Sequence, residues 1–122
     1  PNDNNAAAII QILDKNKQTA VVSGQDASTA GLQNVLLGKQ TATVYKPFSV
    51  EAKAAADLAV KLLKGIKPSV SKKLSDGTPF LASTPILIKA ETVKTVVAAG
   101  DAKVADLCTA AVAAACTKYG VK

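Results

Sequence analysis

Two observations predict an α/β fold built on a partial parallel sheet. Helical and strand patterns alternate in the order α-β-α-β-α over the first half of the chain, an order typical of parallel strands. Two runs rich in β-branched residues, 21–27 and 43–47, each reach a polar residue where the strand ends, and a helical pattern follows each run. In open α/β sheets, ligands bind at the edge that such strand ends form.

The first helix is expected from Asn2 to about Lys15. Asparagine and aspartate oxygens at positions 2–5 can cap helix amides, and apolar residues then recur at helical spacing, namely Ala6, Ile9, Ile10 and Leu13. Residues 18–23 predict a buried strand, residues 30–37 a helix closed by Gly38, and residues 41–45 the next strand.

The strongest helical pattern covers residues 50–63, with Ala54, Leu58 and Leu62 on one face and Gly65 after its end. Residues 67–85 are rich in Ser, Lys, Pro and Gly without a period, which predicts a long connection. Residues 85–89 predict a third short strand, also parallel, and residues 91–99 a short helix. Residues 101–119 are largely helical by composition, with a break around two cysteines.

The predicted sheet is incomplete for an independent domain. The chain begins with a helix whose preceding strand is missing, and three parallel strands leave open edges and uncovered faces. Large core anchors are scarce, since the only aromatic residues are Tyr45, Phe48, Phe80 and Tyr119. We therefore expect the C-terminal portion of a larger protein, completed by an N-terminal portion that could be a companion chain.

Composition argues against several classes of function. The net charge is +6, but all basic residues are lysines scattered along the chain, which favours a solvated surface over a nucleic-acid partner. Histidine is absent, which argues against a zinc site and a Ser-His or Cys-His catalytic unit. No pair of carboxylates lies at a strand end in the arrangement that glycoside hydrolysis needs, and no glycine-rich loop has the spacing of a phosphate-binding loop. No apolar run is long enough to span a bilayer. We therefore expect that the protein is not an enzyme, that it binds no cofactor or metal, and that it does not insert directly into a membrane.

Three polar side chains are expected at the ligand edge of the sheet. Asn2 opens the first helix, Asp26 ends the first strand, and Lys46 ends the second. An amide, a carboxylate and an ammonium together supply the donors and acceptors that a neutral polyhydroxylated ligand needs. The alternative is that Asn2 and Asp26 only cap helices and that Lys46 is a surface ion.

Cys108 and Cys116 are eight residues apart. In an unbroken helix this spacing is about 12 Å, too far for a disulfide. If the chain turns between them, a disulfide can close. The residues alone leave two buried thiols and one disulfide as alternatives.

The motif residues resemble those of bacterial D-xylose-binding proteins, sugar-binding components of ABC importers with the type I periplasmic-binding-protein fold. The resemblance rests on Asn2-Asp3, on Val22-Ser23-Gly24-Gln25-Asp26-Ala27, on Gly38-Lys39-Gln40-Thr41 and on Thr43-Val44-Tyr45-Lys46-Pro47. It runs from Asn2 to about Gly65 and resumes more loosely around residues 84–86. It implies that Asn2, Asp26 and Lys46 hydrogen-bond the sugar, whereas we interpret Asp3 as a helix cap.

The resemblance also implies two Rossmann-like lobes joined by crossing segments. Residues 1–46 would be part of the C-terminal lobe that carries the ligand edge. Residues 47–80 would form a hinge crossing, at Lys46-Pro47, and a helix of the N-terminal lobe. Residues 81–122 would form the return strand and a C-terminal helical tail. The resemblance favours a disulfide between Cys108 and Cys116, as in an exported protein.

The implied function is extracytoplasmic, in the periplasm or lipid-anchored at the cell surface. The protein would bind a monosaccharide, D-xylose by the resemblance, between its lobes and deliver it to an ABC permease. The alternatives are a sugar-sensing module that serves a chemoreceptor or histidine kinase, and the effector domain of a LacI-type repressor.

Overall fold

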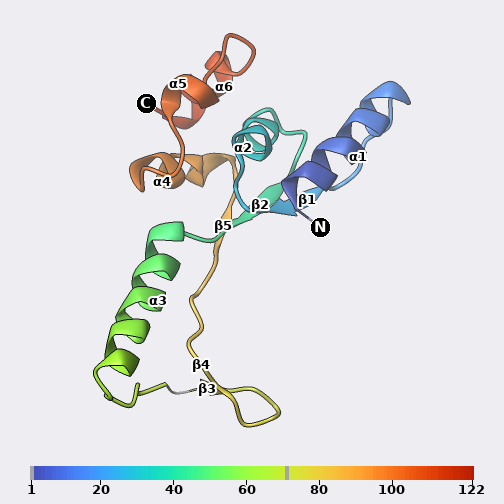
Figure 1. The fold of residues 1–122 in the computed structure, drawn as a ribbon. Coiled ribbons are helices and arrows are strands. Elements are labelled where there is room, and N and C mark those ends of the chain that lie inside the picture. Colours follow the sequence, from blue (N-terminus) through green and yellow to red (C-terminus); the bar gives the residue numbers. More distant parts are fainter. Residues whose placement is uncertain (1, 71) are drawn as a thin grey trace. The chain divides into compact units, whose positions relative to one another are not determined.

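The computed structural model describes residues 2–70 and 72–122, which fall into two compact units (Figure 1). The first unit comprises Pro1–Lys46 and Pro85–Lys122, and the second comprises Pro47–Thr84. Pro1 and Ser71 lie outside the described residues. Pro1 is the first residue of the expected C-terminal lobe, and Ser71 lies in the expected connection. The two units are described separately below.

The first unit is built on a three-stranded sheet in the order β1-β2-β5, with β1 at Ser23–Gln25, β2 at Ala42–Tyr45 and β5 at Ile86–Ile88. Strands β1 and β2 are parallel, and Gly24 lies opposite Thr43. The predicted α/β fold with a parallel sheet is therefore confirmed for this pair. The first strand was predicted too early, at residues 18–23, because only residues 23–25 lie opposite β2 and form ladder pairs.

The prediction that the third strand is parallel was wrong, since β5 runs antiparallel to β2. Tyr45, at the end of β2, lies opposite Ile86, at the start of β5. The chain thus leaves the sheet and re-enters it at neighbouring positions on the same edge. A strand that re-enters beside the exit point of its partner has to run in the opposite direction.

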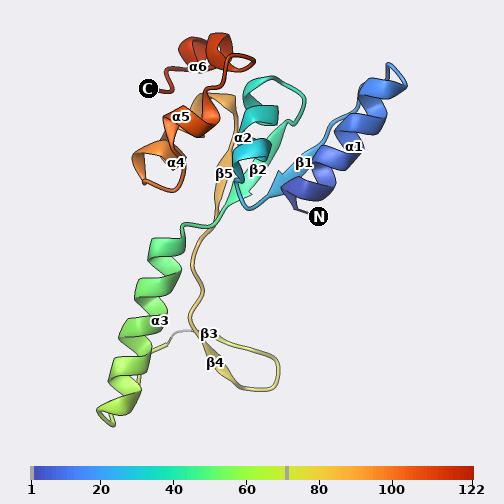
Figure 2. The same ribbon diagram turned by 45° about the horizontal axis from the view of Figure 1, so that its top comes forward.

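Two helices precede β1 and β2, as predicted. Helix α1 spans Asp3–Lys15, and helix α2 spans Thr29–Leu36. Ser28 caps α2, because its Oγ accepts a hydrogen bond from the Gly31 amide at 3.1 Å. Gly38 follows α2 with φ +73°, a left-handed conformation that glycine adopts without a steric penalty. Figure 2 shows α1 beside β1 and α2 beside β2.

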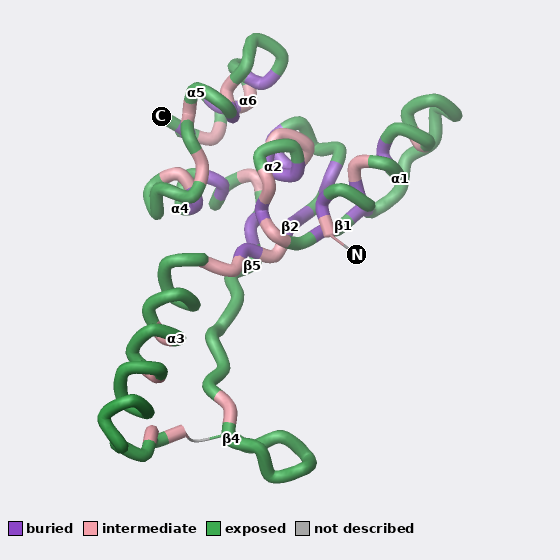
Figure 3. The backbone as a smooth tube through the Cα atoms, in the orientation of Figure 1, coloured by how far each residue is buried: buried purple, intermediate pink, exposed green. Residues whose placement is uncertain are grey.

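The C-terminal part of the first unit is helical but divided into short segments: η1 at Ala90–Thr92, α4 at Val93–Ala98, α5 at Val104–Leu107 and α6 at Ala113–Tyr119. They share one core with α2 and the sheet, and the fully buried members of that core include Leu32, Ile88, Val93, Val96 and Leu107. Figure 3 shows buried positions in each of α2, β2, β5, α4 and α6. The tail is therefore an integral part of the core.

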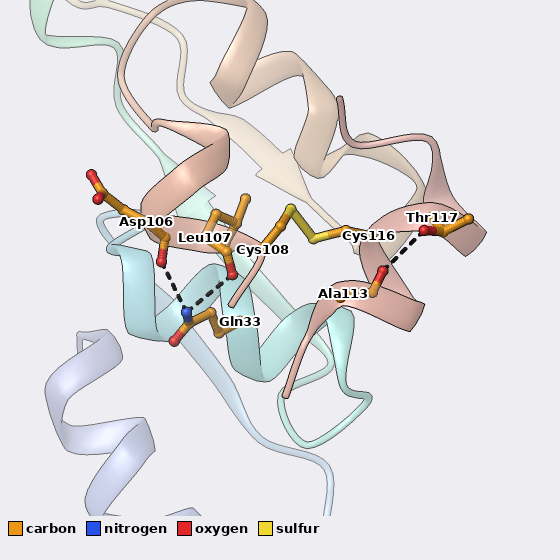
Figure 4. Close-up of a disulfide and its surroundings, with 7 residues drawn as sticks. All are labelled: Gln33, Asp106, Leu107, Cys108, Ala113, Cys116 and Thr117. Atoms are coloured by element: carbon orange, nitrogen blue, oxygen red, sulfur yellow. Dashed lines mark hydrogen bonds between the residues drawn. A yellow bond between two sulfur atoms is a disulfide. The ribbon is translucent and has the colours of Figure 1, made fainter. Parts of the chain in front are cut away.

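A disulfide joins Cys108 and Cys116, with the two Cα atoms 5.9 Å apart. The helical pattern breaks after Leu107 and resumes at Ala113, and this turn brings the two cysteines within bridging distance. Nearby, the Gln33 side chain donates hydrogen bonds to the carbonyl oxygens of Asp106 and Leu107, which ties α2 to the end of α5 (Figure 4). The covalent link thus lies where the tail packs on α2.

The Tyr45 phenol donates a hydrogen bond to the Asp101 carboxylate, and Tyr45 is buried at the end of β2. Burial, together with the Asp101 hydrogen bond and charge, raises the pKa of Tyr45 from 10.0 to about 12. A group with a raised folded-state pKa stabilises the fold below its unfolded pKa and loses that contribution as the pH rises through the folded pKa.

We therefore expect the free energy of unfolding of the full-length protein to fall between about pH 10 and pH 12. The same measurement on Tyr45→Phe, by urea titration at each pH, should show a shallower fall. Tyr119→Phe is the control, because Tyr119 is a partly buried tyrosine that packs against the same core. Equal slopes for wild type and Tyr45→Phe would contradict this prediction.

The second unit contains helix α3 at Phe48–Leu63 and a two-stranded antiparallel sheet of β3 at Lys72–Lys73 and β4 at Pro79–Phe80. The expectation of a connection without structure was therefore wrong for part of residues 67–85. The Leu74 amide donates to the Thr78 carbonyl, and Gly77 takes φ +86°, so local turn chemistry closes this hairpin. None of the described helices is long and apolar enough to cross a membrane.

Candidate functional site

Two of the predicted site residues meet at the carboxyl ends of β1 and β2. Asp26 directly follows β1 and Lys46 directly follows β2, and a parallel pair of strands brings these ends together. The Asp26 amide donates to the Val44 carbonyl at 2.8 Å, which holds Asp26 against β2. The Lys46 Nζ lies 2.7 Å from the Asp26 Oδ1, with 39% of the Lys46 side chain and 41% of the Asp26 side chain exposed.

This ion pair is open to solvent and can receive a ligand. The carboxylate accepts hydrogen bonds and the ammonium donates them, so together they can satisfy both the hydrogen and the oxygen of a hydroxyl group. An exposed pair of this kind contributes at most about 1 kcal/mol to stability. A substitution of Asp26 or Lys46 that removes this ion pair should therefore cost the fold little stability.

The backbone at Asp26 is unusual. Asp26 takes φ +94° and Ala27 takes φ +50°, two consecutive left-handed residues that are not glycine. Aspartate tolerates this region better than most residues, but such conformations still cost about 1–3 kcal/mol each. They persist only where surrounding contacts hold them, and they are common at functional sites.

Asn2 has a different role in the structure. It is the N-cap of α1, where its Oδ1 accepts a hydrogen bond from the Asn5 amide at 3.2 Å. Asp26 is not a helix cap, because Ser28 caps α2. Asn2 is thus a helix cap and Asp26 is not, and the cap uses the Oδ1 of Asn2, so its Nδ2 group can still donate to a ligand. Asn2 is joined to the Asp26 turn through its neighbour, Asp3.

The interpretation of Asp3 as a cap of its own helix was wrong. Asp3 lies in the first turn of α1 and is 2% exposed. Its Oδ2 accepts from the Ser28 amide at 2.8 Å and from the Ser28 hydroxyl at 3.1 Å. Its Oδ1 accepts from the Gln40 Nε2 at 2.9 Å and from the Thr43 hydroxyl at 2.8 Å. One carboxylate thus ties the start of α1 to α2 and β2, and we call this set the Asp3 network.

Two glycines leave room for this carboxylate. A Cβ atom at Gly24 would lie 2.3 Å from the Asp3 Oδ1, and one at Gly31 would lie 2.1 Å from the Asp3 Oδ2. Both distances are far below a van der Waals contact, so any larger residue would displace Asp3. The absence of a side chain, rather than a positive φ, is the reason for glycine at these two positions.

Sequence reasoning missed the parts played by Ser28, Gln40 and Thr43. Two signals were present: a polar Thr43 within an otherwise apolar strand, and glycines inside a strand and a helix, which indicate close approach of other groups. Among residues 2–70 and 72–122, no group of three His, Cys, Asp or Glu side chains could hold a metal ion.

No protein-family model matches the chain, but two curated proteins do. The chain is 37% identical over 98 residues to the D-xylose-binding periplasmic protein of Escherichia coli (strain K12), covering 76% of this chain and 30% of that protein. It is 38% identical over 78 residues to the D-xylose-binding periplasmic protein of Haemophilus influenzae (strain Rd), covering 62% of this chain and 24% of that protein. The chain thus spans less than a third of the length of these relatives.

Two solved structures resemble the chain over 87% of its length. A carbohydrate transporter solute-binding protein from Chloroflexus aurantiacus, in complex with D-glucose, matches with TM-score 0.80 and 28% identity over 33% of that chain. An ABC transporter solute-binding protein from Clostridium phytofermentans, with bound β-D-glucose, matches in fold with TM-score 0.77 and 23% identity over 35% of that chain. The predicted resemblance to D-xylose-binding periplasmic proteins and the fold class are confirmed.

Proposed function

We propose that this chain is part of an extracytoplasmic solute-binding component of an ABC importer. The full-length protein binds a monosaccharide, D-xylose, between two lobes and delivers it to a permease. It makes and breaks no bond, so it is not an enzyme. The sugar would be held by Asp26 and Lys46, with Asn2 as a further ligand and the remaining contacts from the rest of the protein.

The observation that carries this proposal is the Asp26–Lys46 pair at the sheet edge, 2.7 Å apart and open to solvent. A sugar hydroxyl that leaves water needs both a donor and an acceptor, and the pair supplies one of each. The relatives named for D-xylose and the neighbours solved with glucose support a sugar over other polar ligands.

The division of the chain supports the two-lobe mechanism. The first unit ends at Lys46 and resumes at Pro85, so both crossings lie next to the end of β2 and the start of β5. We propose that residues 47–84 belong to the N-terminal lobe and that residues 1–46 and 85–122 belong to the C-terminal lobe. A ligand that contacts both lobes would shift the population toward a closed form that the permease recognises.

The disulfide favours transport or extracytoplasmic sensing over a repressor. Disulfides persist in oxidising compartments and are rare in the cytosol, where a LacI-type repressor acts. The periplasmic relatives support the same location.

Calorimetric titration of the full-length protein with D-xylose and D-glucose, with glycerol as a control polyol, tests the proposal. We expect D-xylose to bind with a dissociation constant of about 1 μM or lower, near −8 kcal/mol or better. Binding of D-glucose alone would overturn the assignment of D-xylose. Glycerol should give no binding heat. The proposal fails if neither sugar produces binding heat or raises the melting temperature at millimolar concentration.

A further inference from the structure

We propose that Asp3 and Thr43 are positioning residues that hold the Asp26 carboxylate in its sugar-binding orientation. The proposal rests on the proposed function, because it assigns these residues a part in ligand affinity and not only in stability. Neither residue would touch the sugar. Both would act through the strained turn at Asp26 and Ala27.

The first step concerns the turn itself. Asp26 and Ala27 both take positive φ, so this backbone has to be held by contacts outside the turn. The Asp26 amide is held by the Val44 carbonyl, and the Ala27 amide donates to the Thr43 Oγ1 at 3.2 Å. The second of these contacts is made by a side chain, so a point mutation can remove it.

The second step concerns the direction of the Thr43 hydroxyl. Thr43 is fully buried, and its hydroxyl lies 2.8 Å from the Asp3 Oδ1. Because an ionised carboxylate only accepts hydrogen bonds, the Thr43 hydrogen points to Asp3 and an Oγ1 lone pair is left for the Ala27 amide. The Ser28 hydroxyl repeats the pattern, since it donates to the Asp3 Oδ2 and accepts from the Gly31 amide.

The Asp3 network therefore holds the second residue of the turn and the residue that follows it, while the Val44 carbonyl holds the Asp26 amide. The Asp3 carboxylate accepts a hydrogen bond from the Ser28 amide, just after the turn. It also accepts one from the Thr43 hydroxyl, which leaves the Thr43 Oγ1 oriented to accept from the Ala27 amide within the turn. Gln40 donates to the same carboxylate at 2.9 Å, and the absence of side chains at Gly24 and Gly31 gives the carboxylate the space that it occupies. This rigid support fixes the direction in which the Asp26 side chain leaves the sheet edge.

The consequence for affinity follows from population arithmetic. If the turn relaxes, only a fraction of molecules keeps Asp26 in the binding orientation, and the observed dissociation constant rises by the inverse of that fraction. A competent fraction of about one in ten would weaken binding about tenfold without any loss of a sugar contact. If the network served only the stability of the fold, removing one of its hydrogen bonds would lower stability and leave sugar affinity unchanged.

Thr43→Val tests the proposal in the full-length protein, because it keeps the shape of the side chain and removes the hydroxyl. We expect a dissociation constant for the bound sugar about tenfold higher by calorimetry. By NMR, we also expect faster hydrogen exchange at the Ala27 amide. Thr43→Ser restores a hydroxyl and should return both values toward wild type.

Val96→Ala is the matched control, since Val96 is also fully buried but lies in α4 and has no side-chain group that could hydrogen-bond the turn. It should lower the melting temperature and leave the dissociation constant and Ala27 exchange unchanged. In an Asp26→Asn background, Thr43→Val should cause little further loss of affinity, because its effect passes through Asp26.

Unchanged sugar affinity in Thr43→Val, or an equal loss in Val96→Ala, would overturn the positioning inference and leave the proposed function standing. Failure of the wild type to bind either sugar would overturn both. Asp3→Asn is a secondary variant, because its NH2 group would replace an oxygen that accepts either from Ser28 or from Gln40 and Thr43, and the resulting clash of donors lowers stability as well.

Discussion

Asp26→Asn should weaken sugar binding by the full-length protein roughly 10-fold or more, with little change in melting temperature. The carboxylate is the acceptor at the candidate site, and a hydrogen bond to a charged group contributes about 1.5–3 kcal/mol. Stability should be nearly unaffected, since the Asp26–Lys46 pair is about two-fifths exposed on each side. Calorimetric titration and thermal melting measure the two effects.

Asparagine is a better test than alanine at this position. Asp26 takes φ +94°, where asparagine is tolerated and alanine is strained. Asp26→Ala would therefore combine the loss of a ligand with backbone strain, and a fall in affinity would have two causes.

Asp14→Asn is a closely matched control for the charge change. Asp14 forms an ion pair with Lys39, and its side chain is 53% exposed in the same unit of the protein. It lies at the end of α1, away from the carboxyl ends of the strands. Asp14→Asn should leave sugar affinity unchanged. Equal affinities for Asp26→Asn and wild type would remove Asp26 from the site.

Gly31→Ala should lower the free energy of unfolding by roughly 3 kcal/mol or more. The new Cβ would lie 2.1 Å from the Asp3 Oδ2 inside the buried network. Asp3 would have to move, and the Ser28, Gln40 and Thr43 donors would lose their shared acceptor. Urea unfolding monitored by circular dichroism measures this loss.

A double-mutant cycle separates this clash from a general effect of the substitution. In an Asp3→Gly background both the carboxylate and the Asp3 Cβ, which would lie 2.8 Å from the new Cβ, are absent. Gly31→Ala should then be close to neutral or stabilising by up to about 1 kcal/mol, as helix propensity favours alanine. A similar loss of stability in both backgrounds would show that the carboxylate is not the obstacle.

The strand-end pattern correctly predicted that Asp26 and Lys46 lie close together. Asp26 and Lys46 each follow a strand, and parallel pairing alone is enough to bring such ends together. The position of Asn2 at the start of α1 was also predictable from capping chemistry. The role of Asp3 was not, because its four hydrogen bonds reach residues 25 to 40 positions further along the chain.

By itself, the sequence determined the three longest helices and the parallel pairing of β1 with β2, because these depend on local hydrophobic spacing and on strand-helix order. Only the tertiary structure decided the direction of β5, since this depends on where the chain re-enters the sheet. It also decided that the turn after α5 brings Cys108 to Cys116, and that one buried carboxylate joins α1, α2 and β2. These features depend on contacts that no local pattern specifies, and the proposed positioning of Asp26 depends on one of them.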